Sequence, residues 1–400
     1  MNDDAAGREN STVSFRRNLP ALLLLTSVFL LNFISRVIFS PLLPEIQLDM
    51  NLAHAVAGSL FLFLSSGYFI SILLSGTVSS RLGHKRTIVV SAVGSGLMLS
   101  LVGFCTTVMS MRIALFCLGY AAGLYLQSGL ATISRLVAPA YLARGIAVHE
   151  LAPNVGFVAA PLLCGLMLPY FSWREGLQVL GVVFGCMGLI YAVKGDGNSR
   201  LARGMNLTLV RRLLVIPQFW LMVLLFSFAI CTTLGIYAML PLYLVTEHGM
   251  DQDAANRLVA LSRVSSVVMP LIAGWVGDRF GNGIVMLNVL LAAGILTIPL
   301  GIFSGYPLVV FVVLQPMVAV CFFPSGLAVL SRIGGIEAQG SAISLCIPFA
   351  FLIGGGVIPL AIGAVGDYYS LAAGFSGIGC IITLVALAAF WIGRKGALLS

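Results

Sequence analysis

Long apolar runs separated by short polar stretches follow one another along the whole chain. Each run is about 20 residues long and nearly free of charge, which is the length that an α-helix needs to cross the hydrocarbon core of a bilayer. No stretch between two runs is long enough for a soluble domain. The pattern predicts an all-α integral membrane protein with twelve transmembrane helices, at residues 19–43, 55–78, 87–107, 111–135, 141–168, 173–194, 218–245, 254–277, 284–303, 306–332, 340–364 and 370–393.

Short motifs recur at corresponding places in the two halves of the chain. The pattern Ser-Gly-Leu-Ala-x-x-Ser-Arg begins at Ser128 and again at Ser325, and Leu-Pro occurs at 43–44 and 240–241. A third set of matches follows the second and the eighth predicted span: Gly76, Arg81 and Gly83 in the first half, and Gly274, Arg279 and Gly281 in the second. Matches in register over most of the chain indicate a duplicated unit. Because six spans return the chain to its starting side, duplication gives two six-helix bundles of the same orientation, related by an axis along the membrane normal.

The longest polar interruption, residues 195–217, lies between the sixth and the seventh predicted span. It is basic and contains glycine and proline, which is typical of a cytoplasmic linker. The sequence therefore divides into a cytoplasmic N-terminal tail at 1–18, an N-terminal six-helix bundle at 19–194, this linker, a C-terminal six-helix bundle at 218–393 and a cytoplasmic C-terminal tail at 394–400.

The composition agrees with a membrane protein, since 59% of the residues are hydrophobic and only 9% are charged. The formal net charge of +8 could indicate a nucleic-acid partner, but the basic residues follow the positive-inside rule. With both termini in the cytoplasm, only Arg112, Arg174 and Arg257 fall on the outer side. We therefore expect a multi-pass protein of the plasma membrane, in a bacterium the inner membrane, and no nucleic-acid partner.

Residues typical of metal sites or catalysis are not arranged for either role. All eight cysteines lie inside apolar runs and form no C-x-x-C pair, which favours packing over metal binding. The pair His149-Glu150 lacks the second histidine of H-E-x-x-H because position 153 is proline. The sequence predicts no enzyme, no metal and no cofactor.

The loop after the second span reads Gly76-Thr-Val-Ser-Ser80-Arg81-Leu-Gly83-His84-Lys85-Arg86 and resembles the signature loop of the major facilitator superfamily, G-x-x-x-D-R-x-G-R-R. The loop after the eighth span, Gly274-Trp-Val-Gly-Asp278-Arg279-Phe-Gly281, is similar to the second-half copy of that loop. With the twelve spans and the central linker, the resemblance covers nearly the whole chain. It implies two bundles that rock about a central site, open to each side in turn.

The signature loops have a physical reading of their own. Glycine permits a tight turn, and basic side chains can bind carbonyls at a helix C-terminus or a carboxylate. We interpret the loops as a latch for one state of the rocking cycle, with Ser80 in place of the usual aspartate weakening the first copy. The predicted gating residues are Gly76, Arg81, Gly83, Lys85, Arg86, Asp278, Arg279 and Gly281, with Arg135 and Arg332 from the repeated Ser-Arg pattern.

Two further departures concern the drug exporters of this family. They usually carry an arginine early in span 4, where this chain has Leu115, and a Gly-Pro signature in span 5, where this chain reads Gly156-Phe-Val-Ala-Ala-Pro161. Both departures weigh against drug:proton antiport.

Three ionised residues inside the predicted spans, Arg36, Glu150 and Arg263, have no counterpart in the other half. A charge at the centre of a membrane helix costs about 3 kcal/mol, so each should face a cavity or a partner. Because the planar guanidinium suits a carboxylate, we interpret Arg36 and Arg263 as binding groups for an anion, and Glu150, assisted by His149, as the protonation site. Candidate secondary contacts are Asn32, Tyr120, Tyr125, Tyr237 and Gln315.

Two structural alternatives remain open for these charges. Glu150 and Arg263 could form a permanent ion pair that holds the halves together, and Arg36 could snorkel to the outer interface.

These residues favour a secondary transporter that moves a small organic anion, such as a monocarboxylate, together with a proton. A membrane potential that is negative inside opposes anion entry by ~2.3 kcal/mol per charge per 100 mV, so inward transport needs a co-transported cation. The alternatives are proton-driven efflux of a drug-like or metabolite compound, a non-transporting membrane sensor or enzyme, and a lipid flippase. The expected partners are an anionic small molecule, protons and membrane lipid, and we expect a monomer.

Overall fold

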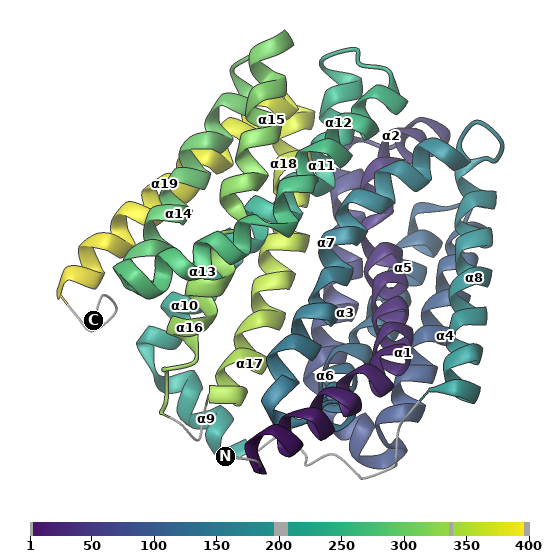
Figure 1. Ribbon diagram of the computed structural model, residues 1–400. Coiled ribbons are helices and arrows are strands. Elements are labelled where there is room, and N and C mark those ends of the chain that lie inside the picture. The colour runs from purple at the N-terminus through teal and green to yellow at the C-terminus, as the bar shows by residue number, and fades with distance from the viewer. Residues whose placement is uncertain (1–2, 196–206, 336–338, 396–400) are drawn as a thin grey trace.

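The computed structural model describes residues 3–195, 207–335 and 339–395, and this part of the chain is helical with no strand. Twelve of its helical segments are long and apolar enough to cross a membrane, which confirms the predicted fold class and number of spans. Figure 1 shows them as a bundle of long helices, most of them running between the same two ends of the molecule.

Each of the first six spans corresponds to one or two helices of the N-terminal half. In chain order they are α1 (Asp3–Val37) with α2 (Phe39–Met50), α3 (His54–Leu82), α4 (His84–Val102), α5 (Val108–Gly123) with α6 (Tyr125–Leu136), η1 (Pro139–Tyr141) with α7 (Leu142–Met167), and α8 (Trp173–Lys194).

The second half repeats this arrangement after a short helix α9 (Leu207–Val215), which lies in the predicted linker. Its spans are α10 (Pro217–Ile230) with η2 (Cys231–Gly235) and α11 (Ile236–Thr246), α12 (Gln252–Arg263) with η3 (Val264–Val267) and α13 (Met269–Phe280), α14 (Asn282–Thr297) with η4 (Ile298–Gly301), α15 (Gly305–Ala319) with α16 (Phe322–Leu330), α17 (Gln339–Leu352) with η6 (Ile353–Val357) and α18 (Ile358–Tyr368), and α19 (Leu371–Lys395). Linker residues 196–206 and tail residues 396–400 lie outside the described part.

The two ends of the bundle are named here by the chain ends. The termini side is the end where α1 begins and α19 ends, and Figure 1 shows N and C there. The far side is the opposite end, with the loops at 51–53, 168–172 and 247–251. The helix of α1 begins at Asp3, so the predicted tail at 1–18 continues directly into the first span. Which side faces the cytoplasm stays a prediction from the charge pattern.

The two signature loops lie on the termini side, where α3 turns into α4 and α13 turns into α14. Gly83 and Gly281 have φ values of 80° and 93°, which non-glycine residues rarely adopt. The tight turn expected from the sequence is therefore present in both copies.

The two halves contact each other mainly toward the far side, where α2 meets α11, α3 meets α18 and α7 meets α12. Glycine allows the closest of these approaches. A Cβ added to Gly58 would lie 2.4 Å from the carbonyl oxygen of Pro359, and one added to Gly363 would lie 2.2 Å from that of His54. The backbones of α3 and α18 thus touch directly across the interface between the halves.

Polar contacts also cross this interface on the far side. The carboxylate of Asp367, near the end of α18, accepts hydrogen bonds from the backbone N–H groups of His54 (2.7 Å) and Ala55 (2.9 Å) at the start of α3. These N–H groups have no partner inside the helix, and a carboxylate also interacts favourably with the positive end of the helix dipole. Asp367 therefore ties the two halves together on the far side.

Candidate functional site: a central cavity

A cavity of about 410 Å³ lies between the two halves, around the middle of the bundle and toward the termini side. Its lining comes from both halves, which places it at the position expected for a central substrate site. The lining residues are mostly apolar and rich in aromatic rings: Phe29, Phe33, Tyr68, Phe157, Phe323 and Phe351. Arg36 and Glu150 are the only charged residues among the described residues of the lining.

Arg36 lies near the end of α1 and is only 8% exposed. Its guanidinium carbon lies 4.3 Å from the ring centroid of Tyr68 and 5.1 Å from that of Phe33. Cation–π contacts of this kind offset part of the desolvation of a buried cation but supply no negative charge. Its Nε has no hydrogen-bond partner among the described atoms. Arg36 is therefore a cation on the cavity wall with no carboxylate partner among the described residues, and it does not snorkel to an interface.

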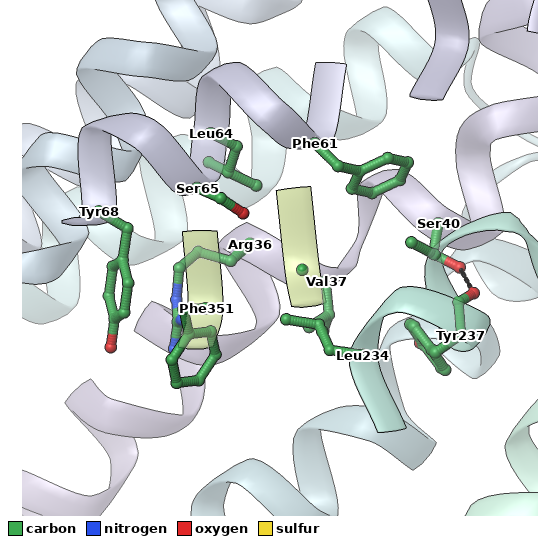
Figure 2. Close-up of a pocket in the computed structure, with 12 residues that line it drawn as sticks. Arg36, Val37, Ser40, Phe61, Leu64, Ser65, Tyr68, Leu234, Tyr237 and Phe351 are labelled. Atoms are coloured by element: carbon green, nitrogen blue, oxygen red, sulfur yellow. Dashed lines mark hydrogen bonds between the residues drawn. The ribbon is translucent and has the colours of Figure 1, made fainter. Parts of the chain in front are cut away.

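A second, much smaller pocket of about 30 Å³ continues from Arg36 toward the far side. It has room for one or two water molecules. Figure 2 shows the guanidinium lying between the rings of Tyr68 and Phe351, with Phe61 and Ser40 beyond it. The passage beyond Arg36 is closed to a larger solute in this conformation.

Arg263 is 1% exposed and is not among the described residues that line the large cavity. Its Nη2 donates a hydrogen bond of 2.7 Å to the carbonyl oxygen of Thr233. Gln315 similarly donates through Nε2 to the carbonyl oxygen of Thr232, at 2.8 Å. Both carbonyls belong to η2, a π-helical turn, and such turns disturb the regular backbone ladder and leave acceptor capacity unused. This geometry favours a structural role for Arg263 and Gln315, and their roles as substrate contacts stay predictions.

Two prolines free further carbonyls at the interface between the halves. Pro161 and Pro241 have no N–H, so the carbonyls of Phe157 and Tyr237 four residues earlier lack their helical donor. The hydroxyl of Tyr237 donates to Phe157 O at 3.4 Å, and the hydroxyl of Ser40 donates to Tyr237 O at 2.5 Å, as Figure 2 shows. Tyr237 thus connects the two halves through its hydroxyl and its carbonyl.

Glu150 lies on α7 and lines the same cavity as Arg36, and its side chain is 49% exposed. Its Oε1 lies 3.2 Å from Nδ1 of the fully buried His149. The ion pair between Glu150 and Arg263 that the sequence left open is not formed: the ion pairs of the described residues give Glu150 only His149 as a partner, while Arg263 donates to a carbonyl. Spans 5 and 8 are instead in contact through a cation–π interaction, in which the guanidinium carbon of Arg263 lies 4.8 Å from the ring centroid of Phe157.

The remaining predicted contacts lie away from the cavity lining. Asn32 is buried and donates through Nδ2 to Ala122 O at 3.0 Å, which ties α1 to α5. Tyr120 is half-buried on α5. The gating residues Arg81, Arg86, Asp278 and Arg279 are exposed on the termini side, Lys85 is half-exposed there, and Arg135 and Arg332 end the repeated pattern on the same side. Gly76 lies within α3, before these exposed residues.

Sequence reasoning missed the aromatic residues around Arg36 and the contact that Asp367 makes between the two halves. Tyr68 and Phe351 come from different halves and look like ordinary apolar-helix residues in the sequence. Asp367 gave no comparable signal, because it lies beyond the predicted span at 340–364, where a carboxylate can face water.

Replacing Gln315 with leucine should destabilise the protein without changing the charge of the cavity. The substitution leaves the carbonyl of Thr232 without its donor in a buried position, which costs about 1–3 kcal/mol. We expect a lower melting temperature of the purified protein in detergent. The matched control is Asn288→Leu, because the Asn288 amide is exposed and bonds only its own helix at Ile284 O. An unchanged melting temperature for Gln315→Leu would contradict the role of this side chain in supporting η2.

Comparison with known proteins agrees with this architecture. The sequence model of the Major Facilitator Superfamily matches residues 25–266 and 235–398. The chain is 25% identical over 363 residues to the membrane sensor protein UhpC of Salmonella typhimurium, covering 81% of this chain and 80% of that protein. It is 26% identical to the probable sulfoacetate transporter SauU of Cupriavidus necator, covering 64% and 62% of the two chains.

The fold is also that of solved transporters. A bacterial homologue of the human lysosomal transporter Spinster, solved in an inward-facing and unoccupied conformation, superposes with a TM-score of 0.80 at 15% identity, over 94% of this chain and 97% of that one. At this level of identity the likeness shows the fold alone. The family match over nearly the whole chain, the twelve spans and the central cavity lead to one conclusion: this protein belongs to the major facilitator superfamily, a family of transporters and not of enzymes.

Proposed function

We propose that this protein is a secondary transporter that moves a small, singly charged organic anion of the monocarboxylate type together with a proton. The observation that carries the proposal is Arg36, a cation on the wall of the central cavity with no carboxylate among its described contacts. A buried cation without a counter-ion is costly, and an anionic substrate removes that cost by binding. The planar guanidinium can also donate two parallel hydrogen bonds to a carboxylate.

The cavity favours an anion of low charge with an apolar body. The described lining offers one cation, so a phosphate ester with two negative charges would be left with an unpaired charge. Its few polar side chains, such as Asn154 and Thr233, also leave little to bind the many hydroxyl groups of a sugar. This distinguishes the proposed substrate from hexuronates, the substrate in the name of a Bacillus subtilis relative that is 28% identical over 44% of this chain and 40% of that protein.

Proton coupling is proposed from Glu150. Its carboxylate is half-exposed on the same cavity as Arg36 and can gain or lose a proton in contact with water. Taking up one proton with one anion makes the transport step electrically neutral, so the membrane potential no longer opposes uptake.

One other function is favoured by a specific finding. The relative UhpC is named as a membrane sensor, so a protein of this architecture that binds a ligand without moving it is a second candidate. A sensor of this kind would bind the anion but would not carry it across the membrane.

The test is uptake by purified protein in proteoliposomes with an imposed pH gradient and a clamped potential. The probes are radiolabelled pyruvate and benzenesulfonate, with glucuronate and glucose 6-phosphate for comparison. The first two are almost fully ionised at the pH of the assay and therefore leak slowly through lipid. We expect accumulation of the first two when the outside is acidic. Protein-free liposomes measure the leak. Failure to accumulate either monoanion overturns the proposal, ligand-induced stabilisation without uptake supports a sensor, and exchange of outward substrate for inward protons supports efflux.

A further inference from the structure

Glu150 is the last member of a continuous chain of hydrogen-bonded side chains, which consists of Tyr125, His149 and Glu150. We propose that the transported proton is held between Nδ1 of His149 and Oε1 of Glu150, and that Tyr125 creates this site by fixing the tautomer of His149. The inference rests on the proposed proton-coupled function and names the atoms that carry it out. Tyr125 is then a positioning residue, since it acts on the proton only through His149.

The direction of each hydrogen bond follows from counting donors. The Tyr125 hydroxyl has one hydrogen, and it lies 2.9 Å from the carbonyl oxygen of Leu25, which can only accept. The same hydroxyl lies 3.0 Å from Nε2 of His149. When both contacts are hydrogen bonds, Tyr125 donates to Leu25 and must accept from His149. Nε2 of the imidazole therefore carries a hydrogen.

The second nitrogen of the imidazole, Nδ1, then lacks a hydrogen-bond donor. A neutral imidazole has one hydrogen, so with Nε2 protonated its Nδ1 is a bare lone pair. That lone pair lies 3.2 Å from Oε1 of Glu150. Two acceptors at this distance repel each other, whereas one additional proton between them turns the contact into a hydrogen bond. A contact of this length fits the proton-loaded pair, whose net charge is zero.

The fully buried imidazole is packed against the Phe29 ring, which opposes a rotation that would exchange its two nitrogens. The Phe29 ring stacks on His149 with centroids 4.2 Å apart and planes 6° apart, and the Phe29 ring also stacks on Tyr125 at 5.1 Å. His149 is 0% exposed, whereas Glu150 is 49% exposed. The pair thus has one fixed member and one member with access to the cavity.

Other charged or titratable groups lie on the helices that pack around α7. They include Arg17 and Arg36 on α1, Glu45 and Asp49 on α2, Arg135 on α6, Tyr141 on η1, Arg144 on α7 itself, Arg174, Glu175, Tyr191 and Lys194 on α8, and Asp253, Arg257 and Arg263 on α12. Of these, Arg36 is the one that shares the large cavity with Glu150 in the described lining. Loss of the proton therefore leaves a negative charge facing the same cavity as the substrate-binding cation.

This arrangement couples proton and anion by competition. With the proton in place the pair is neutral, and Arg36 attracts the substrate anion alone. Without the proton, the negative charge of Glu150 reduces the positive potential that Arg36 creates in the cavity. The substrate anion is then bound more weakly. By linkage, a bound anion strengthens proton binding by the same factor.

The first test is Tyr125→Phe in the same proteoliposome assay. Without the hydroxyl, Nε2 no longer has an acceptor, so the hydrogen can move to Nδ1 and bond an ionised Glu150 with no extra proton. The pH of half-maximal uptake should therefore fall by about one unit, the size expected for one hydrogen bond. The matched control is Tyr243→Phe, which removes another buried hydroxyl, bonded to Leu300 O, and should leave the pH profile unchanged.

A second variant and a direct probe separate this inference from the proposed function. Glu150→Gln should exchange labelled for unlabelled substrate but no longer accumulate it under a pH gradient. Nitrogen-15 NMR of labelled His149 should report hydrogen on Nε2 in the wild type and a change of tautomer in Tyr125→Phe. Wild-type accumulation with an unchanged pH profile in Tyr125→Phe, or accumulation by Glu150→Gln, overturns the proton site alone. Failure of the wild type to accumulate any monoanion under a pH gradient overturns the proposed proton-coupled transport, on which the proton site depends.

Discussion

Uptake of the monoanion should fall by about 10- to 100-fold when Arg36 is replaced with glutamine, which corresponds to the loss of a hydrogen bond to a charged group at about 1.5–3 kcal/mol. Arg36 is the one cation in the described lining of the cavity, so no other lining side chain can replace its charge. The measurement is the initial rate of uptake over a range of substrate concentrations. Arg36→Lys keeps the charge but loses the planar fork and should fall between the two.

Protein stability provides the control for this variant. Arg36 is buried without a described counter-ion, so replacing it relieves a desolvation cost while it loses the contact with the Tyr68 ring at 4.3 Å. We expect a melting temperature equal to or above that of the wild type, and no stabilisation of Arg36→Gln by pyruvate. A variant that still takes up the anion at the wild-type rate would show that the substrate is recognised elsewhere.

Replacing Asp367 with asparagine should open the far side of the protein. The carboxylate bonds two backbone N–H groups of α3 across the two halves, at 2.7 and 2.9 Å, and an amide has no charge and only one acceptor oxygen to offer them. A loss of about 1.5–3 kcal/mol from the far-side-closed state raises the far-side-open population by about 10- to 100-fold. The measurement is the distance between spin labels at positions 53 and 369, with the exposed Cys186 and Cys380 replaced. A second, longer distance should appear.

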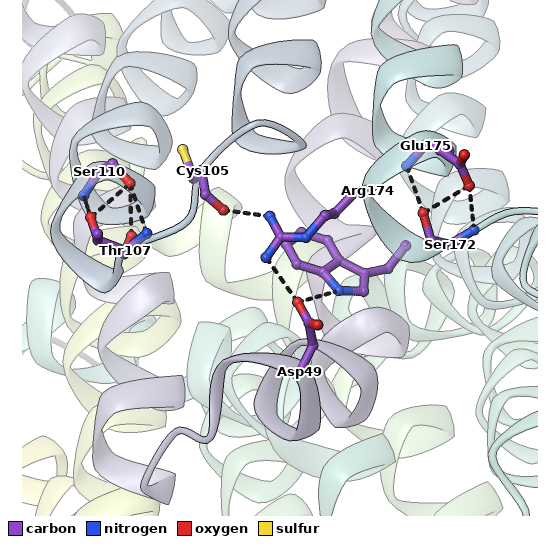
Figure 3. A network of polar contacts seen from close by, with 8 residues as sticks. Asp49, Cys105, Thr107, Ser110, Ser172, Arg174 and Glu175 are labelled. Carbon is purple, nitrogen blue, oxygen red and sulfur yellow. Dashed lines mark hydrogen bonds and ion pairs between the residues drawn. The ribbon is translucent and has the colours of Figure 1, made fainter.

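Asp49 provides a matched control on the same side of the protein. Its carboxylate bonds Arg174 at 2.8 Å and the indole N–H of Trp173 at 3.3 Å, and Arg174 also donates to the carbonyl of Cys105. Figure 3 shows this network, all of whose members belong to the N-terminal half. Asp49→Asn should therefore leave the label distance unchanged. An equal effect of the two substitutions would mean that far-side charge in general, and not the contact between halves, controls the opening.

The fold was predictable because its main determinant is local. A run of about 20 apolar residues must satisfy its backbone internally in lipid, so hydropathy alone places the spans. The repeated glycines were equally informative, since Gly83 and Gly281 adopt the positive φ that their turns require. The tail at 1–18 shows the limit of this reasoning, because hydropathy marks where a span enters the membrane and not where its helix begins, which is Asp3.

The site was predictable only in part, because its contacts depend on backbone defects that hydropathy does not show. Arg36 and Glu150, which line the cavity, could be singled out in the sequence because an unrepeated charge in an apolar helix requires an explanation. The same rule applied to Arg263 led to a substrate anion or Glu150 as its partner, whereas its hydrogen-bond partner in the structure is the carbonyl of Thr233 in a π-helical turn. Such a turn inserts one residue into the ladder and leaves no mark in composition. The freed carbonyl of Tyr237 could have been inferred from Pro241, but its donor Ser40 is distant in sequence.

Gly58 and Gly363 meet the other half through bare main chain, with no side chain of their own inserted between the helices. Smooth surfaces of this kind separate by a small rigid displacement, and no rotamer has to change before they part. Dispersion contacts fade within about 1 Å of separation, so the resistance to parting there is short-ranged. We therefore expect the energy that resists opening of the far side to be concentrated in the first ångström of separation. Further separation of α3 and α18 should meet little additional resistance.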